Sequence, residues 1–201
     1  MAVKVTVFSD YICPFCFVAA ARLERLSREV PLKVEWKGVE IHPETPNEGE
    51  PMSPELQQRL MNPWGPVQDF VTEEGLEFRV PPVLANSRLA LEATEYAREQ
   101  GKLPQFHRAV FEGYWQHGRD IGKAAVLGEI AREVGLDPAA LEGYLKEGRG
   151  RPKLQASMEE AATHQVAGVP SFVFADRFFL EGVQAYDVLK RAALKAAQAT
   201  A

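Results

Sequence analysis

The sequence predicts an α/β protein in which a β-α-β unit opens the chain, a β-β-α unit closes it, and a large all-helical insertion separates them. Three observations predict this order: alternating apolar residues at the start, helical periodicity through the middle, and renewed alternation near the end. With 201 residues, of which 46% are hydrophobic, the chain can bury a substantial core. It is therefore consistent with one domain that carries an insertion.

The opening β-α-β unit follows from three successive patterns. Residues 3–8 alternate in hydrophobicity and are rich in β-branched side chains, which favours a strand. Apolar residues then recur at helical spacing until Pro31, and Pro14 is tolerated in this helix because it lies in the first turn. Residues 32–41 alternate again and predict a second strand.

The middle of the chain, residues 42–168, is expected to form the inserted helical domain. An irregular connection at 42–54, rich in proline and glycine, precedes a pattern that is almost entirely helical. The helices with the clearest apolar stripes are expected to begin near Asn86, Pro104, Leu127 and Asp137. Trp64 and Trp115 are expected in the core, because most aromatic residues at helical spacing pack there.

The closing β-β-α unit begins after residue 168. Residues 171–174 and 178–180 alternate as two strands of a hairpin, and apolar residues at helical spacing over 186–197 predict a final amphipathic helix. Residues 1–41 and 169–201 should therefore form one domain.

Charge and composition restrict the partners of this chain. A formal net charge of −5 and a pI near 5.5 offer no general attraction to nucleic acid or to anionic lipid. The basic run 149–153 is interpreted as a solvated loop between helices, not as a DNA-binding arm. The first residues lack the pattern of a secretory signal, and no segment approaches the ~20 apolar residues of a membrane helix. We expect a cytoplasmic protein whose partners are proteins or small molecules, without nucleic acid or membrane.

Two cysteines, Cys13 and Cys16, stand at the start of the predicted first helix. Side chains at this spacing lie about 5–6 Å apart at Cβ, so a small adjustment brings the sulfurs to disulfide distance. Cys13 precedes the helix, whereas Cys16 falls on its inward-facing stripe. We therefore expect an accessible Cys13 that acts as the nucleophile and a partly buried Cys16 that acts as the resolving thiol.

The start of a helix lowers the pKa of a thiol, because backbone amides and the helix dipole stabilise the thiolate. Pro14 removes one amide donor, and the side chain of Phe15 offers neither charge nor hydrogen bond. The dipole and the remaining amides are therefore expected to supply most of the effect.

Half a zinc site and two incidental core cysteines are the alternatives to a redox pair. Tetrahedral zinc needs four nitrogen or sulfur ligands, yet the chain has no second cysteine pair and its histidines show no ligand spacing. We expect no metal and no cofactor apart from the redox-active disulfide, with glutathione as a candidate co-substrate. A cysteine pair beside a β-α-β pattern is typical of thioredoxin-like redox proteins, and the predicted fold is a thioredoxin fold with a large all-helical insertion.

The segment Ser9-Asp10-Tyr11-Ile12-Cys13-Pro14-Phe15-Cys16 and the late Gly168-Val169-Pro170-Ser171-Phe172 together resemble the DsbA family, more narrowly its FrnE-type cytoplasmic branch. Glu40-Ile41-His42-Pro43-Glu44 and Asn86-Ser87-Arg88-Leu89-Ala90 add to the resemblance, which spans nearly the whole chain. It implies a thiol-disulfide oxidoreductase or disulfide isomerase that acts on protein or small thiol substrates. Such an enzyme also needs a recycling reductase or oxidant as a partner.

The resemblance also implies that Pro170 is cis and stands beside the cysteines, with Val169 presenting backbone groups to a substrate. Tyr11, Pro14 and Phe15 flank the reactive sulfur in sequence and are candidates for substrate contact.

One departure from the thioredoxin-like pattern concerns proton transfer. Such enzymes often carry a buried carboxylate six residues before the first cysteine, where this chain has Val7, and Asp10 is expected in the exposed turn. The proton acceptor for Cys16 stays open.

Two rival functions remain. Glutathione-dependent enzymes of the hydroxychromene-carboxylate isomerase and kappa-transferase type generally present a serine at the first motif position, where this chain has Cys13. A chaperone-like peptide binder would use the groove while its thiols stay idle.

Overall fold

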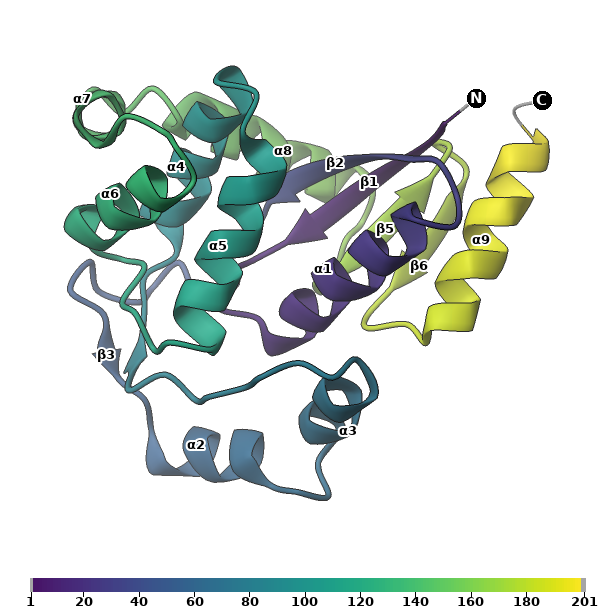
Figure 1. Ribbon diagram of the computed structural model, residues 1–201, viewed down its shortest axis with the longest axis horizontal. Helices are drawn as coiled ribbons and strands as arrows, with labels where there is room; N and C mark the ends of the chain where they lie inside the picture. Colours follow the sequence, from purple (N-terminus) through teal and green to yellow (C-terminus); the bar gives the residue numbers. More distant parts are fainter. Residues whose placement is uncertain (1, 200–201) are drawn as a thin grey trace. The chain divides into compact units, whose positions relative to one another are not determined.

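The computed structural model describes residues 2–199 and is drawn in Figure 1. The described chain falls into two units, of which the first runs up to Ile41 and resumes at Ser157, and the second is His42–Ala156. Within the described part, no helix is long and apolar enough to span a membrane.

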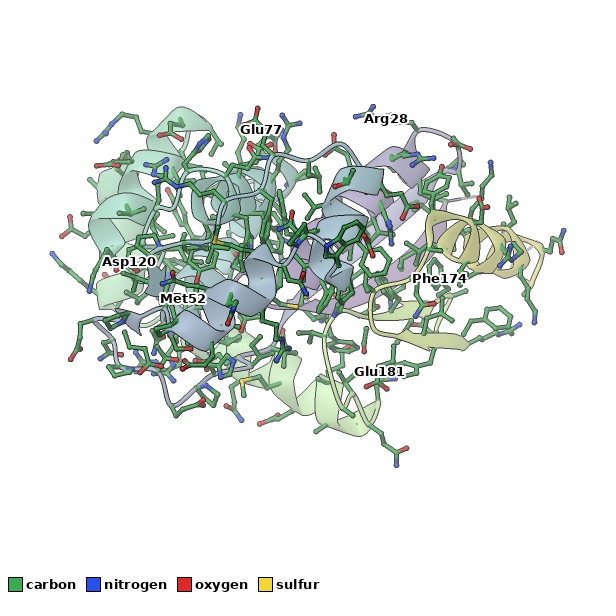
Figure 2. The ribbon with its side chains drawn as sticks, turned by 90° about the horizontal axis from the view of Figure 1, so that it is seen from below. Arg28, Met52, Glu77, Asp120, Phe174 and Glu181 are labelled. Carbon is green, nitrogen blue, oxygen red and sulfur yellow. The ribbon has the colours of Figure 1, made fainter. Side chains whose placement is uncertain are left out.

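A four-stranded sheet forms the centre of the first unit. Its strands are β1 (Val3–Ser9), β2 (Leu32–Gly38), β5 (Ser171–Phe174) and β6 (Phe178–Glu181). They are arranged in the order β2-β1-β5-β6, with β2 parallel to β1, β5 antiparallel to β1, and β6 antiparallel to β5. Phe174 and Glu181, at the ends of β5 and β6, are labelled in Figure 2. Helix α1 (Pro14–Ser27) joins β1 to β2, and α9 (Tyr186–Ala199) follows β6, so the predicted β-α-β and β-β-α units of a thioredoxin fold are confirmed.

Side-chain alternation along β1 separates two hydrophobic clusters. Val3, Val5 and Val7 pack with apolar residues of α1 and α9, which run beside the sheet in Figure 1. Phe8 instead packs with Val173 of β5 and Ala161 of α8 (Arg151–Thr163). This second cluster explains why the two units divide within α8 and not at residues 168/169, where the sequence places the boundary.

The pairing of β1 with β5 brings the two ends of the chain together. Val7 is paired with Phe172 and Phe8 with Ser171. In this register Ser9 would come next to Pro170, which has no amide N–H to continue the ladder. The ladder therefore ends where the segment after β1 leads into the cysteines.

The second unit is mainly helical, as predicted. Its helices are α2 (Pro54–Met61), α3 (Pro66–Glu73), α4 (Arg88–Glu99), α5 (Leu103–Trp115), α6 (Ala124–Glu133), α7 (Pro138–Lys146) and the first part of α8. A short ladder between β3 (Glu50–Pro51) and β4 (Val83–Leu84) was not expected, because two-residue strands carry no readable period. Trp115 is buried as predicted, but the prediction for Trp64 is wrong: its side chain is 89% exposed, because it lies in the turn between α2 and α3.

Gly150 offers a test of packing within the second unit. A β-carbon built on Gly150 would lie 2.6 Å from the carbonyl oxygen of Glu92 in α4. We expect Gly150→Ala to lower the free energy of unfolding by about 1–3 kcal/mol, because the backbone must shift to relieve this overlap. In the matched control Gly143→Ala, the added β-carbon meets nothing within 4 Å inside α7. The control should raise the free energy of unfolding by about 0.5–1 kcal/mol, and urea denaturation showing equal stability for both variants would contradict the packing.

Candidate active site

The two cysteines lie at the N-terminus of α1. Cys13 is the N-cap residue with an extended backbone (φ −90°, ψ 116°), and Pro14 is the first helical residue. The carbonyl oxygen of Cys13 accepts hydrogen bonds from the amides of Cys16 at 3.1 Å and Phe17 at 3.2 Å. Both cysteines are free thiols in this structure. The sequence order strand, turn and helix therefore places both sulfurs within one helical turn.

Both thiols are more buried than the sequence suggests. Cys13 retains 5% of its surface and Cys16 retains none. The expectation of an accessible Cys13 is wrong for the side chain as a whole, because its Sγ donates a hydrogen bond to the carbonyl oxygen of Val169 at 3.6 Å. Cys16 is fully and not partly buried, because it lies on the buried face of α1. Of the two cysteines, only Cys13 has any exposed surface.

The pKa of Cys13 is lowered from the ordinary value, mainly by a hydrogen bond with the Cys16 side chain. Burial opposes this effect, while the backbone amides of Cys16 and Phe15 support it. The expectation that the dipole and the amides supply most of the effect is thus corrected. Cys16 supplies the largest part because its thiol lies one turn further along the same helix.

The pKa of Cys16 moves in the opposite direction, to well above 9.0. Burial is the main cause, and hydrogen bonding to Cys13 adds to it, because Cys16 is the donor in this pair. The two thiols therefore lose their protons in a defined order, with Cys13 first.

The Val169–Pro170 peptide bond is cis, as the resemblance implies. The surrounding loop is held at both ends: the Pro170 carbonyl oxygen accepts from the Gly182 amide at 2.8 Å, and Ser171 Oγ donates to the Gly168 carbonyl oxygen at 2.7 Å. Pro170 is buried and Val169 is partly exposed. The structure thus brings Val169 against Cys13, although the two residues are 156 positions apart.

The other residues expected at the site differ in exposure. Pro14 and Phe15 are partly exposed beside Cys13, whereas Tyr11 retains only 2% of its surface. Burial leaves the Tyr11 ring little surface for substrate contact, so the exposed surface next to Cys13 comes from Pro14 and Phe15.

Asp10 is fully buried, which corrects the expectation that it lies in an exposed turn. Its carboxylate accepts hydrogen bonds from the backbone amides of Ile12 at 3.3 Å and Ile41 at 2.9 Å. The negative charge of Asp10 acts on the pair by raising the pKa of Cys13. A local signal for this arrangement exists in the sequence, because an aspartate that binds the amide two residues later is a common turn former. The contact with Ile41 is long-range and has no such signal.

Metal ligands do not gather in the described part of the chain. No group of three or more histidine, cysteine, aspartate or glutamate side chains there could hold an ion.

The fold and this site define a class of protein: a thioredoxin-fold domain with a pair of thiols at the start of α1 and a cis-proline beside them. The sequence model of the family described as DSBA-like thioredoxin domain matches residues 4–193. The chain therefore belongs to the DSBA-like thioredoxin domain family, whose members are thiol-disulfide oxidoreductases.

Two curated proteins are similar to this chain over most of its length. The chain is 31% identical over 198 residues to the uncharacterized protein YwbO of Bacillus subtilis (strain 168), covering 96% of each chain. It is 25% identical over 183 residues to the 2-hydroxychromene-2-carboxylate isomerase of Sphingobium xenophagum, covering 89% of this chain and 92% of that one.

Solved structures share the fold. A probable DsbA oxidoreductase from Streptomyces coelicolor matches 98% of this chain and 90% of its own, with a TM-score of 0.85 and 22% identity. The cytosolic disulfide reductase DsbM from Pseudomonas aeruginosa, solved with GSH, matches 98% of this chain and 97% of its own, with a TM-score of 0.72 and 18% identity.

The opposite pKa shifts predict the order of alkylation. In the reduced protein, we expect iodoacetamide to modify Cys13 with a half-maximal rate below pH 9.0, while Cys16 stays largely unmodified at that pH. Mass-resolved labelling across pH measures both rates, and the urea-denatured protein, in which the two thiols should react alike, serves as the control. Faster modification of Cys16 in the folded protein would reverse the assigned order.

The hydrogen bond from Cys16 predicts how substitutions at Cys16 change the pKa of Cys13. Cys16→Ala should raise the pKa of Cys13, because it removes the hydrogen bond that lowers this pKa most. Cys16→Ser should raise the pKa of Cys13 less, because the serine hydroxyl can still donate a hydrogen bond to the Cys13 sulfur. Ultraviolet absorbance of the thiolate during a pH titration measures the pKa, and an unchanged value in Cys16→Ala would show that the helix N-terminus alone is sufficient.

Proposed function

We propose that this chain exchanges disulfides with protein or low-molecular-weight thiol substrates, with Cys13 as the nucleophile and Cys16 as the resolving thiol. One observation carries the proposal: two free thiols in one turn of α1 have pKa values shifted in opposite directions. An exchange cycle needs such a pair, because one thiolate must form first and the second thiol must stay in reserve.

The reaction has two steps. The Cys13 thiolate attacks a substrate disulfide, forms a mixed disulfide and displaces one substrate sulfur as a thiolate, which takes up a proton. Cys16 then loses its proton and attacks the Cys13 sulfur, which forms the Cys13–Cys16 disulfide and releases the second substrate thiol. The substrate gains two electrons and the cysteine pair loses two. The same steps in reverse oxidise a substrate dithiol.

The loop at Val169 and Pro170 positions the substrate. In the free protein, the Val169 carbonyl oxygen accepts a hydrogen bond from the Cys13 thiol. When Cys13 carries a substrate it has no proton to donate, so this carbonyl oxygen becomes free to accept from a substrate backbone amide. Pro14 and Phe15 supply partly exposed apolar surface next to the same sulfur.

The proposal includes a cellular compartment and a small thiol co-substrate. We place the activity in the reducing cytoplasm, with glutathione as the co-substrate and with a separate reductase or oxidant for recycling. The structural neighbour DsbM supports this, since it is described as cytosolic and was solved with GSH. A titration in glutathione buffers measures the potential of the pair, for which ~30 mV corresponds to ~1.4 kcal/mol, and so decides the direction of exchange.

A glutathione-dependent isomerase is the second candidate, because one relative is named 2-hydroxychromene-2-carboxylate isomerase. The presence of both Cys13 and Cys16 favours disulfide exchange, since a glutathione-dependent isomerisation of this type changes no oxidation state and has no use for a resolving thiol.

The variant Cys13→Ser distinguishes an exchange enzyme from a chaperone-like peptide binder. In an exchange enzyme it abolishes turnover. In a chaperone-like binder it leaves peptide binding intact, and the unmodified protein has no exchange activity to lose.

Trapping tests the proposed roles. Cys16→Ser should accumulate mixed disulfides with glutathione or protein, because the first attack survives and the resolving attack is lost. The matched control Cys13→Ser should accumulate few, since its remaining thiol is fully buried and has a raised pKa. Non-reducing mass spectrometry after incubation with oxidised glutathione measures the adducts. Equal trapping by both variants would contradict the assignment of nucleophile and resolving thiol.

A further inference from the structure

Ser9 is the last residue of β1 and lies on the side of the sheet that faces α1. Alternation along β1 sends Val3, Val5 and Val7 into the cluster formed with α1 and α9, and Ser9 continues this series. The first turn of α1, with the fully buried Cys16, is on the same side. Ser9 is therefore the polar end of an otherwise apolar row.

The hydroxyl of Ser9 is buried and does not contribute a hydrogen bond to the described part of the fold. Ser9 retains 5% of its surface, and its Oγ makes no hydrogen bond of normal geometry with any described residue. A buried hydroxyl without a partner is costly, so such a group calls for an explanation. Cys16 is the reactive group on the same side of β1, and hydrogen bonding from the Ser9 side chain acts to lower its pKa.

The resolving step requires the buried Cys16 to lose its proton, and a hydrogen-bond donor such as Ser9 would favour this loss. Cys16 must become a thiolate while fully buried, and burial disfavours that charge. The deeper neighbour on the same side of β1 is Val7, which is buried in the hydrophobic cluster and cannot hold a proton or donate a hydrogen bond.

We propose that Ser9 donates a hydrogen bond to the Cys16 thiolate and thereby promotes the attack of Cys16 on the mixed disulfide. This inference rests on the proposed exchange function and adds a residue to its second step. The Asp10 backbone acts in the same direction, since it also lowers the pKa of Cys16. The titratable groups with the largest effects on the pair include the two thiols themselves and the Asp10 carboxylate, whose charge raises the pKa of Cys13.

The aromatic disulfide DTNB separates the two steps. Cys13 attacks DTNB and releases the first coloured thiolate, and Cys16 then attacks the Cys13 sulfur and releases the second. We expect Ser9→Ala to slow the second phase. A loss of one pKa unit of thiolate stabilisation reduces the thiolate fraction about tenfold at a pH below the Cys16 pKa, and the greater nucleophilicity of the more basic thiolate restores about threefold. The second phase should therefore slow about three- to fourfold for each unit by which the Cys16 pKa rises, and its pH midpoint should shift upward.

Thr6→Ala is the matched control, because Thr6 is a buried hydroxyl residue on the opposite face of β1. It should leave both phases as in the unmodified protein. If Ser9→Ala does not fold, Ser9→Thr and Ser9→Val provide a pair of nearly equal shape that differs in the hydroxyl, and only Ser9→Val should slow the second phase.

The outcomes separate this inference from the proposed function. A protein that releases only the first thiolate has no resolving thiol, and the proposed function itself would then fail. Two normal phases in the unmodified protein, together with an unchanged second phase and pH midpoint in Ser9→Ala or Ser9→Val, would overturn the role of Ser9 alone. Equal slowing by Thr6→Ala would show a general effect of β1 packing and would likewise overturn it.

Discussion

The antiparallel register between β1 and β5 is the constraint on which the site depends. Val7 opposite Phe172 and Phe8 opposite Ser171 set the point where the ladder stops and bring the loop at Val169 to the cysteines. A slip by one residue would turn the apolar row of β1 away from α1 and α9. Burial of that row therefore stabilises the register, and the register in turn positions two chain segments that are far apart in sequence.

Hydrogen bonding and burial, more than formal charges, set the pKa values of the cysteine pair. The largest factor that lowers the Cys13 pKa is the neighbouring thiol, and the charge of Asp10 works in the opposite direction. Burial is the main factor for Cys16. A site of this type should respond weakly to ionic strength, because buried contacts are screened much less than exposed charges.

The sequence is most informative where a residue acts through a local rule. Alternation at 3–8 and 171–174, helical spacing after Pro14, and the interval between Cys13 and Cys16 predict the strands, α1 and the reactive pair. Asp10 shows the limit of such rules: its bond to the Ile12 amide is local, but its bond to the Ile41 amide is long-range. The cover that Val169 places over Cys13 likewise comes from strand pairing, and the sequence supports the cis bond at Pro170 only through family resemblance.

The placement of both cysteines in one turn of α1 also affects how the fold responds to oxidation. A bond between Cys13 and Cys16 would close a loop much shorter than the fifteen residues for which the chain-entropy model assigns about 3 kcal/mol of stabilisation. For a loop of four residues the same model assigns about 2 kcal/mol. Because both sulfurs lie within one turn of α1, the sheet and its helices can serve as the same scaffold in both oxidation states.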